Sequence, residues 1–268
     1  MKRREFFAAS TGTGLALAAS TATSGESEKP GKELIELRLY QLASVAKQKA
    51  FDDYLAQAEV PAWNRADVAP VGVFKMLKDD NPQLKMEADS PNLYVLFAHK
   101  SPESFVAVAA RLAKDRIFQE AGKAVLEAPK SDPAFMRYES SLLLAFDGFP
   151  KIVVPSKAES RLFQLRIYES HNSERAFKKI AMFNEGGEIE IFGRCGMTAV
   201  FFGQSLIGAK LPNLTYMLGF ESKEAMDKAW DTFRRDPGWL KLRDDPAYKD
   251  TVSTVTNLIL RPAASSQI

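Results

Sequence analysis

The chain carries one sequence pattern twice, and this internal repeat constrains its fold more than any other feature. Leu37-Arg38-Leu39-Tyr40 returns as Leu165-Arg166-Ile167-Tyr168, and Pro91-Asn92-Leu93 returns as Pro212-Asn213-Leu214. At the same offset of 121 residues, Phe118 meets Trp239. Two copies of one module in one chain predict an intramolecular pseudo-dimer, in which a binding site draws residues from both copies.

Each copy has the order strand, helix, strand, strand, helix, strand. Its first strand, 34–42 in the first copy, alternates leucine or isoleucine with polar or aromatic residues, as a half-buried strand does. This order is the split βαβ, or ferredoxin-like, arrangement, whose antiparallel sheet has helices on one face only. Two such sheets can cover each other's open faces. The sequence therefore predicts an α+β barrel of two fused ferredoxin-like modules, 34–146 and 160–262, with a linker at 147–159.

Glycine and proline mark where several helices should end. A helix from about Ser44 is expected to end before Pro61, and one from Asn172 to end near Gly186-Gly187, where glycine can take a left-handed conformation. Asp236-Pro237 is expected to stop the last long helix.

Residues 1–22 have the order of a secretory signal: a basic start, a short, weakly apolar run and small residues suited to cleavage. The apolar part is too short and too polar for a stable membrane span. The pair Arg3-Arg4 indicates the Tat route, so we expect export to the periplasm or the extracellular space. The alternative is a disordered basic tail.

Charge and cysteine content exclude several classes of site. The full chain has a formal net charge of +2, and removal of the signal leaves equal numbers of basic and acidic residues, which argues against nucleic-acid binding. The single cysteine, Cys195, cannot form an intrachain disulfide, and no Cys/His cluster has zinc spacing. There is no phosphate loop or dinucleotide motif. We therefore expect neither a metal nor a cofactor.

The second copy resembles the NIPSNAP family of the dimeric α/β barrel superfamily. The residues that carry the likeness are Leu165 to Tyr168, Arg234-Arg235-Asp236-Pro237-Gly238-Trp239 and the closing Arg261-Pro262. The first copy departs from this pattern, with Arg116 in place of the proline and Phe118 in place of the tryptophan. The resemblance implies a dimeric α/β barrel-like pseudo-dimer. Family members have no agreed reaction, some relatives take part in protein interactions, and the superfamily includes cofactor-free monooxygenases, so a step from fold to enzyme is analogy.

Two Arg–Tyr pairs are the candidate ligand-binding residues. Arg38 with Tyr40, and Arg166 with Tyr168, alternate with leucines that we expect to pack against the helices. All four side chains should then lie between the two sheets and hold an anionic or carboxylate-bearing ligand. The alternative is that the arginines pair with neighbouring acids such as Glu36 and only tie the halves together.

Within the resemblance, His99, Trp63 and Asn64 are the catalytic candidates, because some cofactor-free oxygenases of this fold use Trp, Asn and His together. Trp63 and Asn64 are expected in the loop before the second strand, and His99 at the end of the third. A packing role for His99 is the alternative, since its counterpart in the second copy is Phe220.

The sequence thus predicts an exported protein that binds a small ligand or a partner protein, and homo-oligomers are compatible with this prediction. The competing hypothesis is a cofactor-independent monooxygenase-like enzyme that uses the cavity between the sheets. Buried polar groups around an open cavity would favour the enzyme, and a cavity filled by Phe, Leu and Met would favour the binding protein.

Overall fold

The computed structural model describes residues 31–268, and the predicted signal at 1–22 lies outside the described residues. Eight antiparallel strands close into one barrel. The strands of the first half are β1 (Leu34–Gln41), β2 (Val71–Lys75), β3 (Leu93–His99) and β4 (Arg137–Ala145). Those of the second half are β5 (Leu162–Glu169), β6 (Thr198–Ile207), β7 (Asn213–Phe220) and β8 (Thr254–Pro262). Their order around the barrel is β1-β3-β2-β8-β5-β7-β6-β4.

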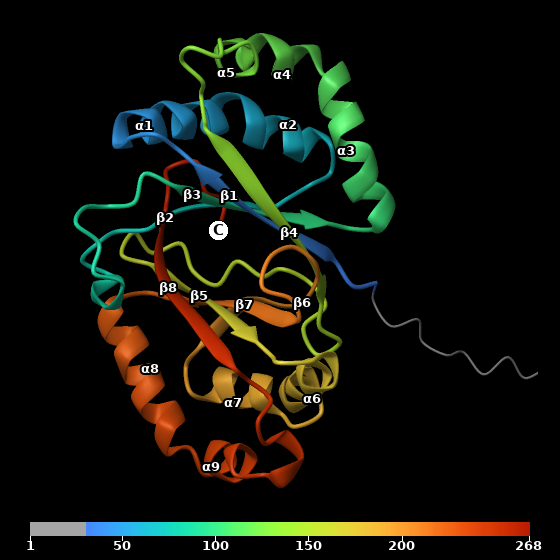
Figure 1. Ribbon diagram of the computed structural model, residues 1–268, viewed down its shortest axis with the longest axis vertical. Helices are drawn as coiled ribbons and strands as arrows, with labels where there is room; N and C mark the ends of the chain where they lie inside the picture. Colours follow the sequence, from blue (N-terminus) through green and yellow to red (C-terminus); the bar gives the residue numbers. More distant parts are fainter. Residues whose placement is uncertain (1–30) are drawn as a thin grey trace, which may run out of the picture.

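The helices lie outside the barrel in two groups, one over each half (Figure 1). The first group is α1 (Val45–Tyr54), a π-helical turn (Leu55–Glu59), α2 (Val60–Arg65), α3 (Pro102–Lys114), α4 (Arg116–Ala121) and α5 (Lys123–Leu126). The second is α6 (Ser173–Asn184), α7 (Glu188–Arg194), α8 (Lys223–Arg235) and α9 (Pro237–Arg243). Short 3-10 turns lie at Pro82–Leu84 and Pro246–Tyr248. None of the helices in this part of the chain is long and apolar enough to cross a membrane.

The two halves have the same strand order, β4-β1-β3-β2 and β8-β5-β7-β6. They join where β4 pairs with β6 and where β2 pairs with β8. The register also corresponds, since Arg38 lies opposite Ser140 of β4 and Arg166 lies opposite Asn257 of β8. The predicted α+β class and the closed barrel are confirmed.

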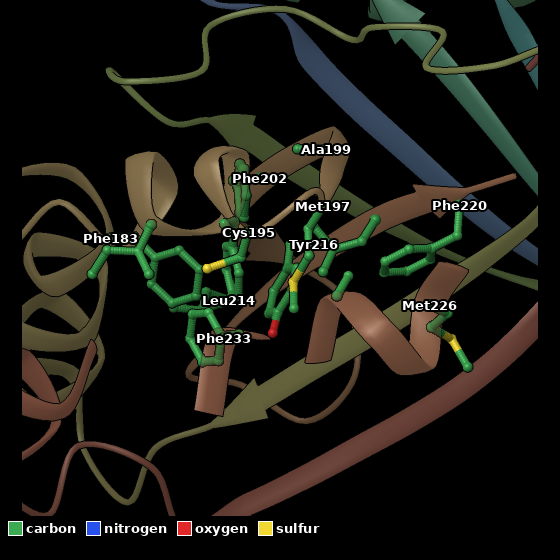
Figure 2. Close-up of a cluster of buried hydrophobic side chains, with 14 of the residues drawn as sticks. Phe183, Cys195, Met197, Ala199, Phe202, Leu214, Tyr216, Phe220, Met226 and Phe233 are labelled. Atoms are coloured by element: carbon green, nitrogen blue, oxygen red, sulfur yellow. The ribbon is translucent and has the colours of Figure 1, made fainter. Parts of the chain in front are cut away.

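Both faces of the barrel wall are buried. Its inside is filled by apolar side chains from both halves, including Leu37, Phe74, Phe163, Leu165 and Met217. Its outside packs under the helices in two further clusters, and Figure 2 shows the one in the second half, where Phe183, Phe202 and Tyr216 pack together.

The predicted orientation of the first strands is therefore wrong. Leu37 and Leu165 point into the barrel, and the Arg–Tyr pairs point outward beneath the helices. Alternation separates two sets of side chains but does not say which set faces the helices. A strand with water on one face would reveal the answer, whereas here both faces are covered.

Proline begins helices in this chain where it was expected to follow them. The π-helical turn lets the chain continue into α2, and Pro61 occupies an early position of that helix, where a backbone N–H is not needed. Asp236 ends α8 and also caps α9, because its side chain accepts a hydrogen bond from the N–H of Trp239 at 2.9 Å, and Pro237 follows as the first residue of α9. The predicted left-handed glycine is confirmed at Gly187, with φ of 81°. The short helix α7 after it was not predicted.

Candidate functional site

A cleft of about 740 Å³ opens between the outer face of the second-half sheet and helices α7 and α8. In Figure 1 it corresponds to the region where α8 runs beside β8 and β5. Residues of the first half reach it too, since the loop after β2 contributes Asp80, Pro82 and Gln83 to the wall. The volume is in the range of small-molecule sites. The cleft is composite, as the repeat predicted.

Arg166 lies in this cleft without an ionic partner. β5 places it beside Tyr168, and its guanidinium carbon is 4.8 Å from the ring centre of Trp230 and 5.2 Å from that of Tyr168. Its Nε atom is buried and has no hydrogen-bond partner among the described residues. Aromatic faces favour a cation, but they do not replace the hydrogen bonds that burial removes.

The other charged groups of the cleft wall are already paired. Lys179 holds Glu188 at 2.7 Å, Arg261 holds Asp80 at 2.7 Å, and Lys223 holds Asp227 at 2.8 Å. Asp231 pairs with Arg234 on the rim. Among the lining residues, which all belong to the described part of the chain, Arg166 is thus the cation left over. A half-buried, unpaired arginine favours an anionic partner.

Neutral hydrogen-bonding groups surround Arg166. Tyr216 donates its hydroxyl hydrogen to Tyr168 at 2.9 Å. Burial raises the pKa of both phenols, so they stay protonated, and the Tyr168 hydroxyl can donate to a ligand. Gln164 accepts a hydrogen bond from the Trp230 indole at 2.7 Å and donates to Asn257 at 2.8 Å.

The corresponding arginine of the first half is fully partnered. Arg38 donates from Nε to Glu36 at 2.6 Å, from Nη2 to the other oxygen of Glu36 at 3.2 Å and from Nη1 to Tyr40 at 3.1 Å. Burial alone would raise the pKa of Glu36, but the hydrogen bond with His99 and the charge of Arg38 hold that pKa at about 2. The pairing of Arg38 with Glu36 was the alternative that the sequence left open, and in the first half it is what the structure shows.

The three catalytic candidates are only partly brought together. Trp63 and His99 are buried in the first half, with ring centres 5.7 Å apart. Their nitrogens contact acids: Trp63 donates to Glu59 at 3.1 Å, and Nε2 of His99 lies 3.3 Å from Glu36. Asn64 is exposed, and both it and Trp63 belong to α2, not to the predicted loop. A catalytic role for these residues stays a prediction.

The space between the sheets is mostly occupied. Apolar side chains fill the barrel over much of its length. A smaller cavity of about 320 Å³ remains at one end, and its lining includes Tyr94, Glu139, Leu165, Ile167 and Leu258. A monooxygenase-like site between the sheets would be confined to this cavity.

The sequence missed several residues of the larger cleft. Glu188 and Lys179 were not singled out, and Trp230 was expected only to pack against the end of its helix. One signal was present: Glu59 and Glu188 each lie four residues before a buried aromatic residue, Trp63 and Phe192, at the end of the first helical segment of their copy.

Comparisons with known proteins agree with this fold. A monooxygenase-like protein from Fusobacterium nucleatum superimposes with a TM-score of 0.58 at 8% identity, over 87% of this chain and 93% of its own. A second one, from Lactobacillus acidophilus, gives 0.57 at 9% identity, over 87% and 94%. At such identities the likeness shows the barrel fold alone.

The family match covers the second half. A NIPSNAP-like domain protein from Burkholderia xenovorans is 21% identical, covers 41% of this chain and 91% of its own, and has a TM-score of 0.35. No curated protein matches the chain. The part of the chain that contains the cleft strands β5 and β8, residues 163–267, matches the NIPSNAP family model.

Proposed function

We propose that the protein binds a small, negatively charged ligand in the cleft of its second half, with Arg166 holding the charged group. The observation that carries this proposal is the guanidinium that lines the cleft beside Trp230 without an acid of its own. An anion there would provide the partner that the folded chain does not.

The rest of the wall suits an apolar, planar ligand body. Phe192, Met226, Trp230, Phe233 and Trp239 line the cleft, and the tryptophans are only partly buried. Flat aromatic surfaces next to one cation and a few neutral donors favour an aromatic or otherwise apolar molecule with one acidic group.

Benzoate and benzamide test this proposal, because they have the same shape and differ in charge. In calorimetric titrations at equal ionic strength, the wild type should bind benzoate and not benzamide. Arg166→Met should weaken benzoate binding at least about tenfold, equivalent to about 1.4 kcal/mol. Arg243→Met is the matched control, since Arg243 is exposed and pairs with its neighbour Asp244. Equal binding of both compounds, or unchanged benzoate binding by Arg166→Met, would contradict the proposal.

We further propose that each half is a ferredoxin-like module and that the chain arose by their fusion. The shared strand order and the repeated Arg–Tyr pairs support this. Expressed alone, residues 160–268 should associate in pairs through the exposed edges of their sheet, because β6 and β8 would lose their partners β4 and β2. A monomeric second half with native circular dichroism would count against a fused pair.

Export through the Tat route remains a proposal from the sequence. It is supported by the pair Arg3-Arg4 ahead of a short apolar run. Replacing both arginines with lysine should leave precursor in the cytoplasm. Unchanged export of that variant would contradict the Tat assignment.

A further inference from the structure

The two halves hold their arginines in corresponding surroundings that differ at one strand position. Each arginine has a tyrosine two residues later and a polar residue opposite it on the neighbouring strand, Ser140 or Asn257. Two residues before the arginine, the first half has Glu36 and the second has Gln164.

In the first half, that position supplies a carboxylate. The two oxygens of Glu36 accept hydrogen bonds from Nε and Nη2 of Arg38, and Ser140 donates to the same carboxylate at 2.8 Å. A planar carboxylate therefore fits beside an arginine in this setting, with the strand opposite as a second donor.

In the second half, the same position cannot supply one. Gln164 is neutral, and its amide is held away by Trp230 and Asn257. Glu188, the buried acid from the helices, is bound to Lys179. The Nε atom of Arg166, whose counterpart in Arg38 meets Glu36, has no partner in the described chain.

We infer that the acidic group bound by Arg166 is a carboxylate, and that Glu36 is the chain's own copy of this group in the closed first-half site. The inference rests on the proposed function and names the chemistry of its ligand. Gln164 is then the residue that keeps the second site open. One unpaired guanidinium and one phenol match a planar monoanion better than a doubly charged phosphate, which would need further cationic partners.

Gln164→Glu tests the inference directly, because it would place an internal carboxylate beside Arg166. The readout is the Nε–H resonance of the arginines in the full chain, titrated with sodium acetate, sodium phosphate or sodium chloride at equal ionic strength. Acetate is the probe because its size cannot limit access. Gln164→Met is the matched control, since it removes the same amide without adding a charge.

In the wild type, the Arg166 resonance should shift with acetate at concentrations at least about tenfold lower than with phosphate or chloride. In Gln164→Glu, it should move toward the Arg38 resonance without added acetate, and its response to acetate should fall at least about tenfold. Gln164→Met should keep its acetate response within about threefold of the wild type.

The outcomes separate the two claims. Tighter binding of phosphate than acetate, or a Gln164→Glu variant that responds to acetate like the wild type, would overturn the carboxylate inference and leave an anion site in place. A loss in Gln164→Met equal to that in Gln164→Glu would also overturn it, because the amide and not the charge would then control binding. An Arg166 resonance that responds to none of the three anions would overturn the proposed function itself.

Discussion

Lys179 and Glu188 form a buried ion pair, with Nζ of Lys179 2.7 Å from a carboxylate oxygen of Glu188. The side chains are 5% and 2% exposed, so water screens the pair very little. Because Lys179 neutralises Glu188, this acid does not neutralise Arg166. The cleft therefore keeps one positive charge for a ligand.

Replacing Lys179 with Met should destabilise the protein and close the site. A buried carboxylate without its partner costs about 3–5 kcal/mol of unfolding free energy, which urea denaturation measures. Glu188 would then turn its charge toward Arg166, so benzoate affinity should fall as well. The double variant Lys179→Met with Glu188→Gln should recover much of both.

Lys178→Met is the control for that variant. Lys178 is exposed and pairs with Glu174 one helical turn away, so its loss should change the unfolding free energy by no more than about 0.5 kcal/mol. A Lys179→Met variant as stable as Lys178→Met would show that the buried pair does not have the role given to it here.

Glu36 should make stability depend on pH in the acid range. Its folded-state pKa is about 2, below the ordinary value of 4.5, because His99 and Arg38 outweigh the effect of burial. A depressed pKa contributes stability that is fully present above pH 4.5 and is lost as the pH falls toward 2. This contribution is on the order of 3 kcal/mol.

Glu36→Gln removes this titration. Its unfolding free energy should change less between pH 5 and pH 2.5 than that of the wild type, as measured by urea denaturation at each pH. The variant should be less stable at pH 7, because Arg38 loses its carboxylate. Parallel pH profiles for the two proteins would argue against the strained balance assigned to Glu36.

Asn81 fastens a loop of the first half to a strand of the second. Its amide donates to the carbonyls of Leu77 and Ile259 at 2.9 and 2.8 Å and accepts from the N–H of Ile259 at 2.8 Å. Asn81→Ala would leave these buried groups without partners and should cost about 2–4 kcal/mol in unfolding free energy. Since this loop forms part of the cleft wall, benzoate affinity should fall too.

Gln83→Ala provides the comparison for Asn81→Ala. Gln83 is exposed and makes one bond from the same loop, to the carbonyl of Asn257 at 3.2 Å. Its loss should cost less than about 1 kcal/mol. Equal stability of the two variants would mean that the loop is held by something other than Asn81.

The repeat predicted the fold because it carries long-range information. Two equal sets of strands that each need a cover imply a closed structure, whichever residues form the contacts. Helix ends were harder, because Pro61 and Pro237 follow caps or turns that release them from hydrogen bonding and so begin helices.

The Arg–Tyr pairs were found by their alternation, but their surroundings were not. Which face of β5 meets the helices depends on how two buried faces divide between barrel and helix layer, and apolar side chains occupy both. The pairing of Lys179 with Glu188 joins two helices across a glycine turn, and neither residue type nor spacing distinguishes it from solvent-exposed charges.

The most direct test of the account is native mass spectrometry of the protein purified from its own host, in parallel with Arg166→Met and Arg243→Met. The account predicts that the wild type and Arg243→Met retain a small molecule with a carboxylate, and that Arg166→Met does not. Retention of the same molecule by Arg166→Met, or a retained molecule without an acidic group, would contradict the central claim that Arg166 forms the ligand site.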